Sequence, residues 1–202
     1  MDTDESRWYT INVVRRHIKD MLEARGDDVS YIQEHGDAVE PERYYNEIIT
    51  LDTNKTVVFF ALNKAKDLKE REKTASDMVT RYEGRKNFIV VLQQAPSSPI
   101  LNQFQARHKD LQKVGGMLHI FYVKELMFNP LIHVAVPKQR KLPQEQASKV
   151  IEDHKIRHKK LMPIISKDDI IARWLGLQVG DIVEITRHNK TSGTYYYYRC
   201  CM

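Results

Sequence analysis

Three short apolar runs constrain the fold of this chain more than any other feature. They are rich in β-branched and aromatic residues and follow one another at regular spacing, at Thr56–Leu62, Asn87–Gln93 and Met117–Val123. Such runs are typical of buried strands. Helical segments are predicted between them, over residues 64–82 after the capping residue Asn63, and over residues 100–114 before a glycine pair. Strands that alternate with helices at this spacing predict an α/β sheet with at least two parallel neighbours.

Helices and strands are also predicted at the two ends of the chain. An amphipathic helix opens it, because apolar residues recur every three or four positions until Gly26, at Trp8, Ile11, Val14, Ile18 and Leu22. Near the C-terminus the patterns predict helices over residues 144–158 and 167–175 and strands over residues 181–187 and 194–201. The expected fold class is therefore an α/β N-terminal domain, with a mixed sheet flanked by helices, plus a small α+β C-terminal domain.

Prolines and charge divide the chain in the same way. Residues 125–143 contain Pro130, Pro137 and Pro143, which predicts a linker between a domain at 1–124 and a domain at 144–202. Residues 1–124 carry 19 basic and 19 acidic side chains, whereas residues 125–202 carry 13 and 8 and account for the whole net charge of +5. A basic half is compatible with a nucleic-acid partner, although a solvated basic face is the more common explanation.

Several protein classes are excluded by composition. The longest apolar run has six residues, against about twenty for a membrane-spanning helix, so no membrane partner is expected. The N-terminus is acidic and polar, unlike a secretory signal. The two cysteines, Cys200 and Cys201, are adjacent and cannot cross-link a fold, which favours a reducing compartment. Neither a phosphate-binding glycine loop nor a nucleophile elbow occurs, and no cofactor is predicted.

Candidate catalytic and metal-binding groups are sparse. A metal-dependent nuclease needs two or three acidic residues at neighbouring strand ends, and only Asp52 and Glu125 flank the predicted strands. His154 and His158 share a predicted helix, but the surrounding basic residues favour a solvated surface over a metal site. The basic cluster Lys155–Lys160 offers contacts to phosphate or to an acidic partner, with a solvated face as the simpler interpretation. The tyrosines at 195–198, with Arg199, offer a stacking surface, although packing within a sheet is the default expectation.

A series of short motifs in the last seventy residues carries a family resemblance. The motifs have the order and spacing of the family pattern, so no gap is needed to align them. They are Val136–Gln139, Leu161–Ile165, Asp169–Leu177, Gly180–Ile185, Thr191–Gly193 and Tyr198-Arg199. This segment resembles the assembly domain of the fifth shared subunit of eukaryotic nuclear RNA polymerases, and it is similar to the archaeal counterpart of that subunit. Several positions depart from the family pattern, and Glu184 and Lys190 reverse its charges. Such divergence is typical of a polymerase from a large DNA virus or a deep eukaryotic branch.

The N-terminal residues resemble more loosely the jaw domain of the same family, which is nuclease-like in fold but lacks an active site. The resemblance implies a non-catalytic subunit of a multisubunit DNA-directed RNA polymerase. Its C-terminal domain would dock on the largest subunit beside other polymerase subunits, and its N-terminal domain would form the lower jaw near downstream DNA. A cellular version is expected in the nucleus, and a viral version in the virion or in the host cytoplasm or nucleus.

The resemblance also implies functional residues. The loop at Pro96, Ser97 and Ser98 aligns with the family loop that faces downstream DNA, so it is expected to make weak contacts to the backbone of the double strand. Residues expected at the subunit interface are Asp169, Arg173, Trp174, Gly176, Thr191, Ser192, Gly193, Tyr198 and Arg199. Arg173 and Arg199 are candidates for charge-assisted bonds, either across the interface or within the domain.

Two other functions stay open on the residues alone. One is a nuclease-like enzyme in the N-terminal domain, with the C-terminal domain as its adaptor. The other is a free-standing nucleic-acid-binding module, which the neutral N-terminal half disfavours.

Overall fold

The computed structural model describes residues 4–30, 40, 42–62, 85–191 and 193–202. The chain forms two compact units, Met1–Phe128 and Asn129–Met202. The helix predicted over residues 64–82 lies outside the described residues, as does Ser192 of the predicted interface. No helix among the described segments is long and apolar enough to cross a membrane.

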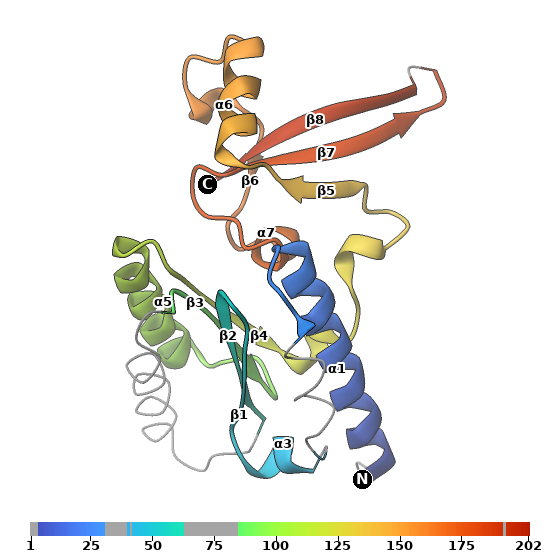
Figure 1. The fold of residues 1–202 in the computed structure, drawn as a ribbon, viewed down its shortest axis with the longest axis vertical. Helices are drawn as coiled ribbons and strands as arrows, with labels where there is room; N and C mark the ends of the chain where they lie inside the picture. The colour runs from blue at the N-terminus through green and yellow to red at the C-terminus, as the bar shows by residue number, and fades with distance from the viewer. Residues whose placement is uncertain (1–3, 31–39, 41, 63–84, 192) are drawn as a thin grey trace. The chain divides into compact units, whose positions relative to one another are not determined.

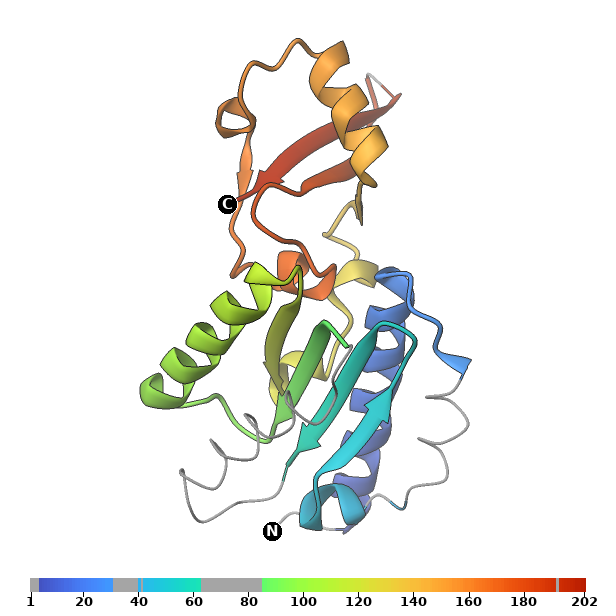
Figure 2. The ribbon, with the colours of Figure 1, turned by 60° about the vertical axis from the view of Figure 1, so that its left-hand side comes forward.

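The first unit is built on a four-stranded sheet in the order β1-β2-β3-β4. Its strands are β1 (Ile49–Asp52), β2 (Thr56–Ala61), β3 (Asn87–Leu92) and β4 (Met117–Tyr122). β1 pairs antiparallel with β2, whereas β2, β3 and β4 are parallel neighbours, as Figure 2 shows. The predicted parallel α/β unit is thereby confirmed for these strands, and the antiparallel β1 makes the sheet mixed.

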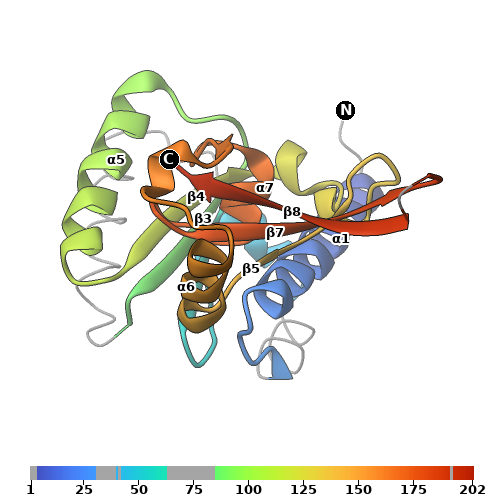
Figure 3. The ribbon, with the colours of Figure 1, turned by 90° about the horizontal axis from the view of Figure 1, so that it is seen from above.

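Helices cover both faces of this sheet (Figure 3). α5 (Ser98–Lys113) places Leu111 against Val57, Phe88 and Leu118. α1 (Asp4–Ala24) lies on the other side of the strands and buries most of its predicted apolar stripe at 0% exposure, at Ile11, Val14, Ile18 and Leu22. Trp8 was expected in that stripe but is 57% exposed, because it lies in the first turns of the helix. On the same side, the short helix α3 (Arg43–Asn46) packs Tyr44 edge-on against Phe60.

The first unit closes with the 3₁₀ turn η1 (Val123–Leu126), which contacts α1. His17 Nδ1 lies 2.7 Å from the carbonyl oxygen of Leu126. Arg25, just after α1, is half-buried beside His119, and the desolvation of its guanidinium lowers its pKa to about 10. These contacts attach the opening helix to the end of β4.

The second unit is a smaller sheet in the order β5-β7-β8-β6. The long strands β7 (Ile182–Asn189) and β8 (Gly193–Cys201) form an antiparallel hairpin that extends beyond the short β5 (Lys138–Lys141) (Figure 1). β6 (Ile164–Ile165) pairs only with the last two residues of β8. The unit also contains two 3₁₀ turns, η2 (Pro130–Ile132) and η3 (Lys159–Leu161).

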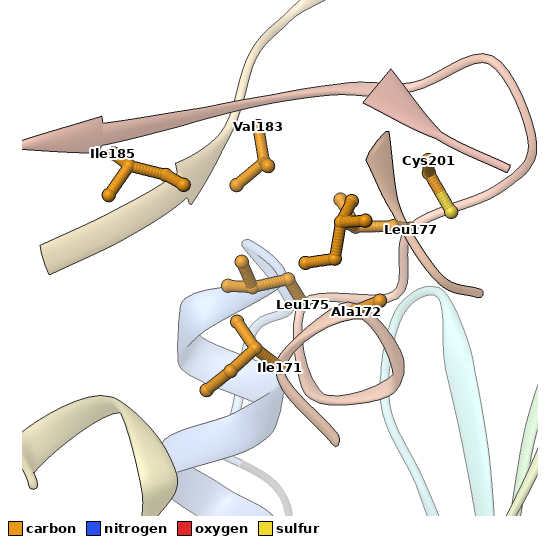
Figure 4. Packing of buried hydrophobic residues seen from close by; sticks show 8 residues of the cluster. Ile171, Ala172, Leu175, Leu177, Val183, Ile185 and Cys201 are labelled. Carbon is orange, nitrogen blue, oxygen red and sulfur yellow. The ribbon is translucent and has the colours of Figure 1, made fainter. Parts of the chain in front are cut away.

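Two separate cores lie on the two faces of this second sheet. α7 (Ile170–Trp174) packs Ile171 and Ala172 under Val183 and Ile185 of β7, as Figure 4 shows. α6 (Gln144–Asp153) covers the opposite face with a core of Leu142, Ala147, Met162, Ile182 and Cys200. Because neighbouring strand residues point to opposite faces, Cys201 joins the first of these cores and Cys200 the second.

Three sequence-based boundaries differ from the structure. Residues 138–141 were assigned to a linker, but they form β5 and pair with β7. The segment lies between Pro137 and Pro143 and contains no proline itself, so its backbone N–H groups can pair. The helix expected over residues 144–158 ends at Asp153, where Lys155 turns into the left-handed region at φ 51°. The helix expected over residues 167–175 starts only at Ile170, after its capping residue Asp169.

Candidate subunit interface and DNA-proximal loop

The predicted interface residues of α7 lie around the two ends of that helix. Asp169 is its N-cap, and its Oδ1 accepts a hydrogen bond of 2.7 Å from the backbone N–H of Ile171. Gly176 ends the helix at φ 64°, a conformation that favours glycine. Trp174 is fully buried and Arg173 is half-buried between them. The capping residue and the glycine therefore set the bounds of the short helix that carries Arg173.

A polar row crosses the sheet on the face that α6 covers. Glu184 of β7 pairs with Arg140 of β5, with 2.7 Å between Oε1 and Nε, and lies directly opposite Tyr198 of β8. The Tyr198 hydroxyl donates to Glu184 Oε2 at 3.4 Å. Burial raises the pKa of Tyr198, and the negative charge of Glu184 adds to this shift. The charge that Glu184 reverses relative to the family pattern is thus balanced by Arg140 of the same chain.

A cation–aromatic stack occupies the other face of the hairpin. The Arg187 guanidinium lies 4.6 Å from the centre of the Tyr197 ring, and that of Arg199 lies 5.8 Å from it. Arg199 Nε is buried and has no hydrogen-bond partner within the described parts of the chain. Sequence reasoning considered Tyr197 among the four tyrosines and named Arg199, but it missed Arg187. The strand alternation, which places positions 187, 197 and 199 on one face of the hairpin, is the signal that could have found Arg187.

The predicted turn residues lie at the tip of the hairpin. Thr191 is exposed, and its backbone N–H donates to Asn189 Oδ1 at 3.1 Å. Gly193 starts β8 at φ 71°. The structure therefore places Thr191 and Gly193 at one end of β8 and Tyr198 and Arg199 at the other, so the predicted residues do not form one compact patch.

The loop that was predicted to face DNA lies between β3 and α5. Ser97 is the N-cap of α5, and its carbonyl accepts from the Leu101 N–H at 2.9 Å, but its hydroxyl makes no capping bond. Ser97 and Ser98 are exposed, while Pro96 is half-buried. α5 begins two residues earlier than expected, at Ser98, with Pro99 in its first turn. The loop thus exposes two serines at the positive end of a 16-residue helix dipole.

The acidic residues considered for nuclease chemistry do not converge. Asp52 lies opposite Val57, where the parallel strands begin, and its carboxylate pairs with Arg85 at 3.0 Å. Glu125 follows the other end of β4, where its Oε2 accepts from the Tyr122 N–H at 3.3 Å. The length of a six-residue strand, roughly 15 Å or more, separates these two ends of the sheet. Among the described residues, no group of three or more His, Cys, Asp and Glu side chains has the arrangement of metal ligands.

The remaining candidate groups have packing roles. Cys200 and Cys201 are buried, as expected, and burial raises both thiol pKa values, that of Cys201 to about 11. Such thiols stay protonated and are poor nucleophiles. His154 is the C-cap of α6 and its ring lies 5.7 Å from that of Tyr198, whereas His158 lies beyond the helix. The two histidines therefore do not share a helical face.

The second unit is thus a small sheet with a helix on each face, and its long hairpin carries charged and aromatic side chains. The C-terminal domain model of the RNA polymerase Rpb5 family matches residues 128–201, which is nearly the whole second unit. The RNA polymerase subunit Rpo5 of the archaeon Pyrococcus horikoshii is 43% identical over 72 residues, 36% of this chain and 87% of its own length.

Eukaryotic relatives extend the match into the first unit. The rpabc1 subunit of RNA polymerases I, II and III from Dictyostelium discoideum is 31% identical over 150 residues, 74% of this chain and 73% of its own. Subunit 5B of RNA polymerases IV and V from Arabidopsis thaliana is 29% identical over 126 residues, 62% of this chain and 54% of its own. The chain belongs to the Rpb5/Rpo5 family of DNA-directed RNA polymerase subunits, and it is an accessory rather than a catalytic subunit.

Proposed function

We propose that the second unit attaches the chain to the largest subunit of a multisubunit RNA polymerase, and that it contacts other polymerase subunits as well. The observation that carries this proposal is the extent of the archaeal match. The 72 matched residues make up 87% of the archaeal subunit, so that protein has little beyond a counterpart of the second unit. Whatever holds the archaeal subunit in its polymerase must therefore lie in the part that this chain shares.

Within the second unit, the residues that offer charge-assisted bonds to another chain are Arg173 on α7 and Arg199 on β8. Arg199 supports this role best, since its buried Nε donates to no described residue of its own chain. A guanidinium held beside Tyr197 has a fixed geometry, which suits a carboxylate or a backbone carbonyl of a partner. The caps Asp169 and Gly176 would act by positioning Arg173, and the turn at 191–193 and Tyr198 would add contacts along the hairpin.

The first unit would form the lower jaw beside downstream DNA. Support comes from the eukaryotic relatives, whose similarity extends into this unit, and from the Ser97–Ser98 loop. Exposed hydroxyls and N–H groups at a helix N-terminus suit phosphate oxygens, which position a duplex without reading its sequence. The chain would then consist of a jaw domain, a proline-containing linker and an assembly domain. A nuclease-like ancestry of the jaw would account for its parallel sheet.

The subunit role is tested by purification from the native source. A tagged full-length chain should recover the large catalytic subunits in equal amounts and with non-specific transcription activity. Arg199→Glu should reduce that recovery at least about tenfold. The substitution removes a buried guanidinium bond to the partner and places a negative charge against the partner's acceptor oxygen. Lys149→Glu, an equal change of charge on an exposed residue of α6, serves as the control. Recovery of the chain without polymerase subunits would overturn the proposal.

The jaw role needs a second experiment, in assembled polymerase on a DNA template. A photoreactive group attached at Ser98→Cys should cross-link to the downstream duplex. The same group at Val114→Cys should not, because Val114 is exposed at the far end of α5, about 24 Å along the helix. Equal cross-linking from both positions would contradict the placement of the loop.

The cell compartment follows from the same assignment. A cellular version of this chain would act in the nucleus with the polymerases of its relatives. A version encoded by a large DNA virus would act in the virion or the host cell.

A further inference from the structure

A groove in the second unit is lined by neither Arg173 nor Arg199, and Tyr198 is the one residue that it shares with the proposed attachment to the largest subunit. It encloses about 640 Å³ between the turn at residues 154–157, the segment 161–163 and the Tyr196–Tyr198 stretch of β8. Three consecutive strand residues point to alternate faces of a sheet, so all three can line one groove only along the edge of the strand. The groove therefore runs along the outer edge of β8.

That edge is open for pairing. β8 pairs with β7 along its whole length on one side, but on the other side β6 reaches only Cys200 and Cys201. Over residues 193–199, β8 has no second strand partner among the described residues. An open edge presents unpaired backbone N–H and C=O groups, and it accepts an extended peptide as an added strand.

The walls of the groove combine an apolar floor with a basic rim. Met162, Ile156 and Tyr198 belong to the core beneath α6, and Leu161 at the mouth is 71% exposed. Lys155 and Arg157 are exposed at the rim and pair with no carboxylate in the described segments. None of the described residues that line the groove is acidic. This surface is complementary to a ligand with one apolar side chain flanked by negative charges.

The backbone at Lys155 provides a second, independent observation. Lys155 adopts φ 51° and is the only non-glycine residue with a positive φ among those the structure describes. It closes α6 in the way that Gly176 closes α7, with the next N–H, that of Ile156, bonded to the Ile151 carbonyl at 2.9 Å. Glycine would fit this position without strain, so the lysine found there indicates a use for its side chain.

We propose that this groove binds an extended acidic peptide segment of a partner protein. The segment adds to the outer edge of β8, places an apolar side chain on Met162 and Tyr198, and pairs its carboxylates with Lys155 and Arg157. Single-stranded nucleic acid fits less well, because it uses successive free aromatic faces. Three tyrosine rings line the groove. Two guanidinium groups flank the Tyr197 ring and His154 flanks the Tyr198 ring, so Tyr196 is the one exposed ring of the three on which a base could stack.

The binding test uses the full-length chain and three fluorescent probes. They are a nine-residue peptide of alternating Glu and Val, the same peptide with Lys in place of Glu, and a twelve-nucleotide oligouridine. Fluorescence anisotropy should show binding of the acidic peptide alone, and the affinity should fall as salt is raised. Oligouridine binding that equals peptide binding, or no binding of the acidic peptide, overturns the proposal.

Charge variants locate the site. Lys155→Glu with Arg157→Glu should weaken the acidic peptide about tenfold or more, because two attractive pairs become repulsive. Lys149→Glu with Lys167→Glu changes the net charge equally at exposed positions outside the groove, and should leave affinity within about twofold. Equal losses in both double variants would mean non-specific attraction, and a change of oligomeric state in the groove variant alone would mean that a second copy occupies it. Either result overturns the proposal.

Lys155→Gly separates a binding role from a folding role. The substitution relieves the backbone strain, so the melting temperature should stay the same or rise, while peptide affinity falls about threefold. A lower melting temperature, or unchanged affinity, would show that Lys155 serves the fold and not the peptide.

Discussion

The two sheets of this molecule differ in what they leave on their surfaces. In the first unit, β2 and β3 bury nearly every residue, because α1 and α5 cover both faces. In the second unit, β7 and β8 are buried mainly at the end where Ile182 lies beside Cys200, and their other positions are mostly half-buried or exposed and include arginine, tyrosine and glutamate. The first sheet is thus a scaffold whose polar groups lie in loops such as 96–98. In the proposed function the second sheet is itself the binding surface, and the extent of the archaeal match supports that proposal.

The largest expected loss of stability comes from removing a large side chain from the core of the first sheet. Phe60→Ala should lower the free energy of unfolding of the first unit by about 3–5 kcal/mol, since Phe60 is fully buried and packs against Tyr44. Ile185→Ala is the equivalent change in the second sheet and should cost about 2–4 kcal/mol there.

Hydrogen exchange measured residue by residue reads both effects. Phe60→Ala should expose the amides of β2 and β3 and leave those of β7 and β8 protected, while Ile185→Ala should do the reverse. The exposed Tyr9→Ala is the control for the first unit. If either core variant opens both sheets equally, the two units do not fold as separate cores, and the comparison between them fails.

The next largest loss of stability is expected from a substitution at the end of α7, in the second unit. Gly176→Ala should destabilise this unit by about 1–2 kcal/mol, because alanine at φ 64° brings its Cβ close to the backbone. Val179→Ala, a nearby exposed position, should change stability by less than about 0.5 kcal/mol. Urea unfolding followed by the fluorescence of Trp174 in a Trp8→Phe background would measure both. An equal cost at the two positions would show that Gly176 is not a conformational requirement.

Sequence patterns predicted much of this fold because they record burial directly. The runs at 56–62, 87–93 and 117–123 are strands, and the stripe from Ile11 to Leu22 is a buried helical face. The end of α6 could not be predicted in the same way, because Lys155 carries none of the usual signals for a left-handed residue. Trp8 was wrongly predicted to be buried, because periodicity alone does not show where a helix extends beyond the sheet that it covers.

The candidate site was less predictable than the fold. Motif order identified Asp169 and Gly176, whose local roles as a cap and a helix end follow from their residue types. The Arg187–Tyr197–Arg199 stack depends on the register between β7 and β8, which pairs Ile185 with Tyr197 and is not visible in either strand alone. The groove at Lys155 requires three segments to meet, and this information exists only in the folded unit.

A smaller effect depends on the fact that both cysteines lie in the second unit. Burial raises the pKa of the Cys201 thiol to about 11 in the folded state, so the unfolded state loses its proton first as the pH rises above about 9. The stabilisation conferred by Cys201 is therefore complete below pH 9 and is lost as the pH approaches 11. The stability difference between the wild type and Cys201→Ala should shrink by about 1 kcal/mol between pH 8.5 and pH 10.5.

Urea unfolding at a series of pH values, again with Trp174 as the reporter, checks this expectation. The first unit contains no cysteine, so its own unfolding, followed by hydrogen exchange of the β2 and β3 amides, provides an internal reference. A stability difference that stays constant with pH would mean that the Cys201 thiol is not shielded from water in the folded unit.

The smallest effect tests whether the polar row of the second sheet stabilises it. The Arg140 side chain is 55% exposed and that of Glu184 only 12%, so their ion pair is partly screened by solvent. Glu184→Gln should cost about 0.5–1 kcal/mol, and a double-mutant cycle with Arg140→Gln should assign most of that cost to the pair. The coupling should decrease at about 1 M salt, because screening weakens half-exposed pairs. If the cycle instead shows no coupling at low salt, the row contributes no stability, and the contrast between a scaffold sheet and a binding sheet becomes sharper still.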